Sequence, residues 1–328
     1  MRKTKKSSSF FRHDPELIGT RARQAERQLA RCTLCPRRCG VNRVEGQAGF
    51  CGIEPQARVA SFGPHFGEES VLVGENGSGA IFFSGCNLQC VFCQNHAVSS
   101  VQPGQAPGGE EVSAVELAGI MLELQARGCA NINLVTPSHV VPQILAALAI
   151  AAGRGLHLPI VYNTSSYDRL KTLRLLDGVV QIYMPDCKFW SADKAGKYLA
   201  APDYPDVMQA ALREMYRQTG DLVVDDQGVA ARGLLVRHLV MPGMQQETEW
   251  IMTFLAREIS RDTYVNVMDQ YHPCYRAHEY PEIDRMLSVE EYNQAMRAAR
   301  AAGLHRFAER DISRLVAMLA GSQERGIS

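Results

Sequence analysis

Three closely spaced cysteines are the residues of this sequence best suited to carry chemistry. Cys86, Cys90 and Cys93 follow the spacing CxxxCxxC. Each iron of a 4Fe-4S cluster takes one external ligand, so three thiolates hold three irons and leave the fourth iron open for a reaction. A catalytic metal site keeps such an open position, whereas a structural site closes it. The spacing therefore predicts a reactive 4Fe-4S cluster, and a zinc site completed by His96 is the alternative.

A second group of cysteines lies nearer the N-terminus, with the spacing CxxCx3Cx11C: Cys32, Cys35, Cys39 and Cys51. Four thiolates close a coordination shell, which suits a structural zinc ion and a second 4Fe-4S cluster equally well. The stretch is rich in glycine, which lets the backbone bend around a metal. We expect a metal site here, and the sequence leaves the identity of the metal open.

The elements that must position these thiols follow from the pattern of apolar residues. From about Arg58 onward, short β-branched runs alternate with longer helical stretches, which is typical of repeated βα units and a parallel sheet. The first of the three closely spaced cysteines follows directly after the first of these runs, and active sites of such barrels lie at the carboxyl ends of the strands. Six strands are predicted, at residues 80–84, 131–135, 158–162, 179–184, 234–240 and 264–268.

Two of the intervening helices carry clear start signals. Ser113 with Glu116, and Ser288 with Glu291, match the capping box, in which side chains satisfy the free N–H groups of the first helical turn. Residues 247–260 place their apolar side chains on one helical face, as expected for a helix that covers a sheet. The alternation of six strands with helices predicts an open, TIM-like partial barrel.

Composition excludes several classes of partner. Lysine plus arginine and aspartate plus glutamate both number 35, so no net field attracts nucleic acid or an anionic membrane. The longest apolar run, near residues 144–152, is shorter than the roughly 20 residues that span a bilayer. Residues 1–12 are polar and basic, lack the apolar stretch of a signal peptide and are expected to be disordered. Ten cysteines in such a chain indicate metal binding in a reducing cytoplasm.

The three-cysteine motif resembles the signature of radical S-adenosylmethionine (SAM) enzymes, because an aromatic residue, Phe92, precedes its last cysteine. The resemblance implies that SAM chelates the open iron through its amino and carboxylate groups. Reductive cleavage of the sulfonium then yields a 5′-deoxyadenosyl radical. The chain is most similar to activating enzymes of the pyruvate formate-lyase activating type, and especially to their uncharacterised paralogues with a Cys-rich N-terminal segment. The similarity runs from about Cys32 to Tyr280.

Two segments at predicted strand ends resemble the SAM-binding elements of this family. Asn163 and Thr164 stand where the family has Asp-Thr-Asn, which helps to frame the methionine end of SAM, and asparagine at the first position removes a charge. Asp186 and Lys188 match the family's Asp-x-Lys element, which lies beside the SAM carboxylate. A buried ammonium is costly unless it is paired, so Lys188 needs an anionic partner, and a bound carboxylate provides one.

Four further positions are candidates for SAM contacts through the same resemblance. Arg237 stands in a stretch similar to the family's Arg-x-x-x-x-Pro-Gly, which implies a contact with the SAM ribose or carboxylate. His272 stands where the family has Tyr-His. The family binds the SAM amino group through Gly-Gly-Glu after the second strand, and this sequence has Thr136 and Ser138 in that place.

These observations divide the chain into three parts. Residues 1–56 form an N-terminal tail, a helix expected over 22–31 and a Cys-rich metal-binding segment. Residues 57–288 form a radical SAM partial (β/α)6 barrel of the α/β class, and residues 289–328 form a C-terminal helical extension. The predicted function is reductive cleavage of SAM. The resemblance implies a glycyl radical enzyme as partner and flavodoxin or ferredoxin as electron donor. The alternative is a non-enzymatic iron–sulfur or zinc protein that acts as an electron carrier or interaction module.

Overall fold

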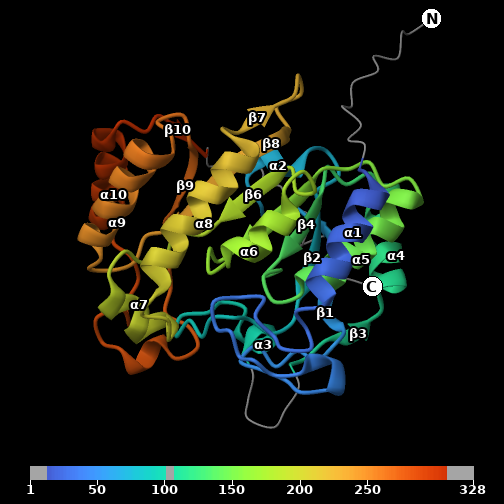
Figure 1. Ribbon diagram of the computed structural model, residues 1–328. Coiled ribbons are helices and arrows are strands. Elements are labelled where there is room, and N and C mark those ends of the chain that lie inside the picture. Colours follow the sequence, from blue (N-terminus) through green and yellow to red (C-terminus); the bar gives the residue numbers. More distant parts are fainter. Residues whose placement is uncertain (1–12, 101–106, 309–328) are drawn as a thin grey trace, which may run out of the picture.

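Six parallel strands form the centre of a single open sheet in the computed structural model, which describes residues 13–100 and 107–308 (Figure 1). In sheet order they are β2 (Ser78–Phe83), β4 (Ile132–Val135), β5 (Ile160–Thr164), β6 (Ile182–Pro185), β8 (Ala230–Leu239) and β9 (Tyr264–Met268). Neighbouring strands of this set pair in parallel. Each overlaps one of the six predicted strands, so the predicted α/β class and the open arrangement are confirmed.

Four further strands extend the sheet beyond the prediction: β1 (Ala57–His65), β3 (Glu110–Val112), β7 (Val223–Val224) and β10 (Arg306–Phe307). β1 runs antiparallel to both β2 and β3, β7 is antiparallel to β8, and β10 pairs in parallel with β9. These strands were missed because β1 contains a proline and has exposed residues at its centre, and the others have only two or three residues. Residues 1–12, which were expected to be disordered, lie outside the described part of the chain.

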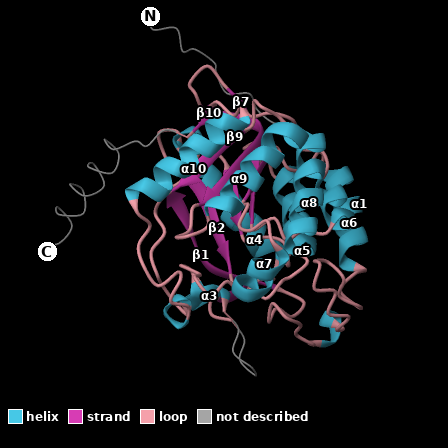
Figure 2. Ribbon diagram, turned by 90° about the vertical axis from the view of Figure 1, so that its left-hand side faces the viewer, coloured by secondary structure: helices cyan, strands magenta, loops and turns pink. Residues whose placement is uncertain are grey.

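The longer helices lie along one face of the sheet, from α10 and α9 at one end to α5 and α4 at the other (Figures 1 and 2). They are α1 (Pro15–Glu26), α4 (Ala114–Ala126), α5 (Val141–Gly153), α7 (Ala192–Leu199), α8 (Tyr204–Thr219), α9 (Gln245–Phe254) and α10 (Val289–Ala302), with short turns α2 (Ser70–Val73), α3 (His96–Ser99) and α6 (Leu170–Leu173). Both predicted capping boxes are present, at the starts of α4 and α10. Within residues 13–100 and 107–308, no helix has the length and apolar character to cross a membrane.

Two helix predictions differ from the structure in detail. The N-terminal helix, expected over 22–31, runs over 15–26 because Asp14 caps it by accepting N–H bonds from Glu16 and Leu17, with proline at the first helical position. The helix expected over 247–260 is α9, which continues into a π-helical turn over 255–259. Its predicted apolar face is buried as expected.

The two faces of the sheet are covered differently. Side chains alternate between the faces of a strand. Tyr162 and Leu234 point toward the long helices and belong to the main core. On the opposite, inner face, Leu72 of α2 packs with Val161 and Leu235 and covers the sheet toward the amino ends of its strands. Polar side chains line the same inner face near the carboxyl ends of the strands.

Buried contacts to backbone carbonyls fix the N-terminal segment against the loop that carries Cys86, Cys90 and Cys93. The Arg43 guanidinium, which is 1% exposed, donates to the carbonyls of Glu54 and His139. His139 in turn donates its Nε2–H to the carbonyl of Ser84 at 2.8 Å, which fixes its tautomer. Gly85 has φ +74°, and a β-carbon there would lie 2.4 Å from the carbonyl oxygen of Cys51. The two cysteine-containing segments therefore touch through their backbones.

We expect Gly85→Ala to destabilise the fold by more than about 1 kcal/mol, because alanine meets both a left-handed backbone and a carbonyl at closer than contact distance. Gly63→Ala is the matched control, since no atom lies within 4 Å of a β-carbon built there. Chemical denaturation of both variants measures the difference. Equal stability of the two variants would contradict the close contact.

Candidate functional site

The loop after β2 holds the three predicted thiols close together in half-buried positions. Cys86 Sγ accepts the Leu88 N–H at 3.3 Å, and Cys93 Sγ lies 3.1 Å from the Ser99 hydroxyl. The charges of Cys86 and Cys93 each influence the titration of Cys90, which shows that the three sulfurs lie within electrostatic reach of one another. An N–H bond to sulfur is a common feature of thiolates that bind iron–sulfur clusters.

Burial makes the thiols poor acids, and one cation opposes this effect. Burial raises the pKa of Cys86 to about 11, while the Leu88 N–H and the Lys188 ammonium act in the opposite direction. Burial also raises the pKa of Cys90, and Lys188 is the strongest influence that lowers it. A bound metal deprotonates its thiol ligands outright, so the loop is suited to a cation that supplies the missing positive charge.

Aromatic side chains enclose the loop. Phe92 is 5% exposed and meets Phe189 and Tyr271 edge to face, with ring centroids 6.0 and 6.3 Å apart. The carbonyl of Phe92 accepts the Cys274 thiol at 3.3 Å, and the Arg276 N–H donates to the carbonyl of Val91. The segment after β9 thus packs on the cysteine loop and shields it from water.

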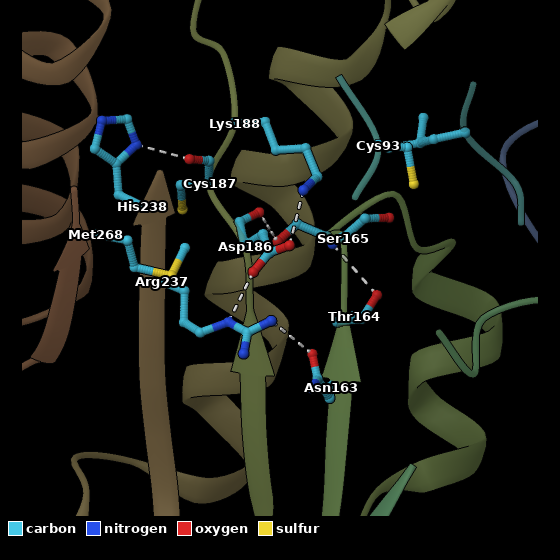
Figure 3. A network of polar contacts seen from close by, with 12 residues as sticks. Cys93, Asn163, Thr164, Ser165, Asp186, Cys187, Lys188, Arg237, His238 and Met268 are labelled. Atoms are coloured by element: carbon cyan, nitrogen blue, oxygen red, sulfur yellow. Dashed lines mark hydrogen bonds and ion pairs between the residues drawn. The ribbon is translucent and has the colours of Figure 1, made fainter. Parts of the chain in front are cut away.

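Polar side chains from three strands meet beside this loop, as Figure 3 shows. Asp186 Oδ2 accepts the Lys188 ammonium at 2.8 Å, and Asp186 Oδ1 accepts Arg237 Nε at 2.9 Å. Arg237 Nη2 also donates to Asn163 Oδ1 at 3.1 Å. Lys188 thus has an anionic partner within the chain itself, Asp186, in addition to the bound carboxylate that the sequence predicted. The structure brings together four of the predicted residues, Asn163, Asp186, Lys188 and Arg237.

These ion pairs keep every member charged. Burial opposes ionisation of Asp186, but Lys188 and Arg237 outweigh burial and lower its pKa to about 2. Burial acts to lower the pKa of Lys188, but Asp186 and Cys90 raise it above its usual value. The Asp186 carboxylate has salt bridges on both of its oxygens, and the Lys188 ammonium has two donors left for another anion.

Thr164 and Ser138 lie next to this network in a buried cluster of their own. Their hydroxyls are 3.1 Å apart, and the Thr164 hydroxyl donates to Asp168, which also accepts the Tyr162 hydroxyl at 2.9 Å. Ser138 is 3% exposed. Its hydroxyl is therefore engaged with the protein, and half-buried Thr136 is the more accessible of the two candidates after β4.

Backbone strain marks two of the strand ends. Thr136 has φ +61° and Ser166 has φ +65°, a region that residues with side chains rarely adopt. The Thr136 N–H donates to the carbonyl of Asn163, and the Ser166 hydroxyl donates to the carbonyl of Asp186 at 2.6 Å. Strained residues of this kind cluster at functional sites.

The structure does not bring His272 into this network. Its side chain is exposed, and its Nδ1 lies 3.3 Å from the carbonyl of Gln270. His96, the alternative zinc ligand, stacks on Tyr275 with ring centroids 4.9 Å apart and places its Nδ1 3.2 Å from the carbonyl of Cys93. Among the described residues, the structure shows no contact between either histidine side chain and the three thiols.

Two acidic residues at the site were not foreseen. Glu68 and Glu69 follow β1, and Glu68 pairs with Arg237 at 3.2 Å. Glu69 accepts the side-chain amide of Asn266 at 2.8 Å. No short-range pattern in the sequence singles out this pair, because its partners lie on β8 and β9, far along the chain.

The four N-terminal cysteines also come together. The Cys32 N–H donates to the carbonyl of Val41, and the Gly40 N–H to the carbonyl of Cys32, so this hairpin carries Cys35 and Cys39 on its turn. Cys39 Sγ accepts the Phe50 N–H at 3.3 Å, next to Cys51.

Electrostatic coupling joins all four of these thiols. Burial raises the pKa of Cys35 to about 12, and the charges of Cys51, Cys32 and Cys39 all act on it in the same direction.

Comparison with solved structures finds weak similarities. SuiB of Streptococcus suis bound to precursor peptide SuiA aligns with a TM-score of 0.44 and 10% identity, over 69% of this chain and 47% of that chain. Native anSMEcpe with bound AdoMet aligns with a TM-score of 0.44 and 8% identity, over 68% of this chain and 61% of that chain. TYW1 with a lysine-pyruvate adduct bound aligns with a TM-score of 0.38 and 10% identity, over 69% of this chain and 74% of that chain. This chain spans about half the length of SuiB, and similarities this low carry no functional argument.

Comparison with curated sequences gives a stronger result. No protein-family model matches the chain. The uncharacterized protein MJ0808 of Methanocaldococcus jannaschii is 23% identical over 292 residues, which cover 80% of this chain and 78% of that protein. The uncharacterized protein MJ0674 of the same organism is 32% identical over 288 residues, which cover 87% of this chain and 79% of that protein. The chain belongs to the same protein family as MJ0674 of Methanocaldococcus jannaschii.

Proposed function

We propose that this chain is a radical SAM enzyme. Cys86, Cys90 and Cys93 hold a 4Fe-4S cluster with one open iron, and SAM binds beside Asp186 and Lys188. The observation that carries the proposal is the position of Lys188, whose ammonium lies close enough to lower the pKa of two of the three thiols while it is paired to Asp186. When bound, the reduced cluster and SAM together supply a 5′-deoxyadenosyl radical.

The residues of this chain bind and orient the cofactor in this proposal. Lys188 offers its two remaining donors to the SAM carboxylate, and Asp186 fixes the direction in which the ammonium points. The Tyr204 hydroxyl lies 2.9 Å from the carbonyl of Asp186 and 3.0 Å from that of Ser165, which holds two strand ends in register. Phe92 and its aromatic neighbours exclude water from the thiols.

The N-terminal cysteines hold a second 4Fe-4S cluster in our proposal. The Phe50 N–H bond to Cys39 is suited to a cluster sulfur. Arg37 bridges the two segments, since its Nε donates to the carbonyl of Asn87 at 2.8 Å and its guanidinium stacks on Phe50. The charge of Cys51 also acts on the pKa of Cys86. In this proposal the second cluster exchanges electrons with the first.

The resemblance of the sequence to activating enzymes supports two partners. We propose a glycyl radical enzyme as the protein that receives the radical, with flavodoxin or ferredoxin as the electron donor. Anaerobic pull-down with the tagged, cluster-loaded chain tests both partners. The alternative function, a non-enzymatic iron–sulfur or zinc protein, is supported instead if the loaded chain binds no SAM.

Cys90→Ala should remove the reactive cluster, because only two thiolates remain in the loop. We expect loss of 5′-deoxyadenosine release when the anaerobically reconstituted chain is incubated with dithionite and SAM. Cys129→Ala is the matched control, since Cys129 is a buried thiol outside both groups, and it should keep the activity. Undiminished release from the Cys90 variant would refute the proposal.

Lys188→Met should weaken SAM binding by about ten-fold or more, because it removes a charged donor from the proposed carboxylate site. Iron content should stay at the wild-type level, since lysine is not a metal ligand in the proposal. Calorimetric titration of the reconstituted, unreduced chain with SAM measures the affinity, and iron analysis is the control. An unchanged affinity would exclude Lys188 from the SAM site.

Cys35→Ser should lower the iron content from about eight to about four atoms per chain, because each cluster contains four irons. Zinc should be absent from both the variant and the wild-type chain after anaerobic purification. Metal analysis by mass spectrometry gives both quantities. One zinc ion per wild-type chain, lost in the variant, would instead identify the N-terminal site as a zinc site.

A further inference from the structure

Glu68 and Glu69 place two carboxylates on the inner face of the sheet. They lie on the loop between β1 and α2, and the position of α2 on that face brings them in from the end opposite the cysteine loop. Glu68 accepts the Asn133 amide at 3.0 Å and pairs with Arg237 at 3.2 Å, and Glu69 accepts the Asn266 amide at 2.8 Å. The pair is therefore held by side chains from β4, β8 and β9.

Two buried acceptor atoms in this group have no partner. Glu69 Oε2 and Asn133 Oδ1 are inaccessible to solvent and accept no hydrogen bond from the described residues. Glu69 is 7% exposed and Asn133 is fully buried. An unsatisfied buried acceptor costs about 1–3 kcal/mol, so native structures rarely leave one without a group that donates to it.

Acidic side chains also gather around these acceptors. Glu68 and Asp186 both pair with Arg237, and Asp186 pairs with Lys188. Burial raises the pKa of Glu68 and the charge of Glu69 raises it further, whereas Arg237 and His65 act against both. The carboxylates therefore repel each other, and a cation between them would relieve this repulsion.

Solvent reaches two neighbours of this group, Arg237 and Asp186. The side chains of Arg237 and Asp186 are 19% and 17% exposed, although both are fixed in ion pairs. Arg237 joins the two ends of the site, because its Nε contacts Asp186 and its Nη1 contacts Glu68. A group bound at Glu69 therefore lies next to the proposed SAM site without occupying it.

We propose that Glu69, supported by Glu68, binds a primary ammonium group of the substrate. An ammonium has three N–H donors and a positive charge, so it satisfies the free oxygen of Glu69 and pairs with its carboxylate. A hydroxyl or a water molecule supplies donors but leaves the charge uncompensated. A free alkylamine and a lysine side chain carry the same group. The catalytic meaning of this subsite rests on the proposed radical SAM function, but the binding of the ammonium does not.

The test uses n-butylammonium as the probe, titrated into the cluster-loaded full chain with saturating SAM, and 1-butanol as its uncharged analogue. We expect the chain to prefer butylammonium by about ten-fold or more, the range of a charged hydrogen bond. Glu69→Gln should abolish this preference, and Glu69→Asp, which keeps the charge, should retain part of it. Glu123→Gln, an exposed position on α4, is the control and should bind like the wild-type chain.

A peptide with one internal lysine, compared with its norleucine analogue, separates the two sources of the ammonium. Binding of the lysine peptide with an affinity equal to or above that of butylammonium assigns the site to a peptide substrate, and binding of butylammonium alone assigns it to a small amine. Equal binding of butylammonium and 1-butanol to the wild-type chain would overturn the inference. Competition between butylammonium and SAM would also overturn it, because the acceptors would then serve the cofactor.

Release of 5′-deoxyadenosine from the same wild-type preparation keeps the two proposals apart. If the chain cleaves SAM but shows no preference for the ammonium, the subsite fails and the radical SAM function stands. If the ammonium binds in a Glu69-dependent way and no SAM is cleaved, the subsite stands and the proposed function fails.

Discussion

The carboxylate of Asp186 is the point on which the candidate site depends. It holds Lys188 on one oxygen and Arg237 on the other, and it lies at the carboxyl end of β6 between two neighbouring parallel strands. Because a buried charge without a partner is strongly unfavourable, each of the three groups fixes the position of the others. Removing any one of them would leave a charge in a site from which water is largely excluded. The directions in which the lysine and arginine point are therefore properties of the network.

This network also explains why the inner face of the sheet can hold polar residues. Side chains alternate between the two faces of each strand, and the main hydrophobic core lies on the face that the long helices cover. On the other side, α2 covers the apolar layer, and the next layer contains Asn133, Asn163 and Asn266. Asn133 and Asn266 donate to carboxylates and Asn163 accepts from Arg237, so amides bond to both kinds of charge without adding any.

The central part of the fold could be predicted from the sequence because its signals are local. Six apolar runs marked the parallel strands, and two capping boxes marked helix starts. The unpredicted strands β1, β3, β7 and β10 carried no such pattern. Asp14 and Pro15 mark the start of α1, and the predicted helix began too late in the chain because it did not use these two residues.

Within the site, spacing predicted the cysteines, and a short motif predicted Asp186 and Lys188. The role of Ser138 depends on its contact with Thr164, which lies on a different strand, and no local pattern reveals such a contact. Glu68 and Glu69 were missed for the same reason, since their neighbours are set by how α2 closes one end of the sheet. His272 stays a prediction, because its exposed side chain makes no contact with the network.

The contact between Gly85 and the carbonyl of Cys51 has an evolutionary consequence. The Gly-rich segment that carries four cysteines is not an interchangeable module, because its backbone fills the space that any side chain at position 85 would need. A related protein that lost this segment would be released from the requirement for glycine at that position, and one that gained it would first have to acquire the glycine. Residues 32–53 and the turn at 85 should therefore be inherited together.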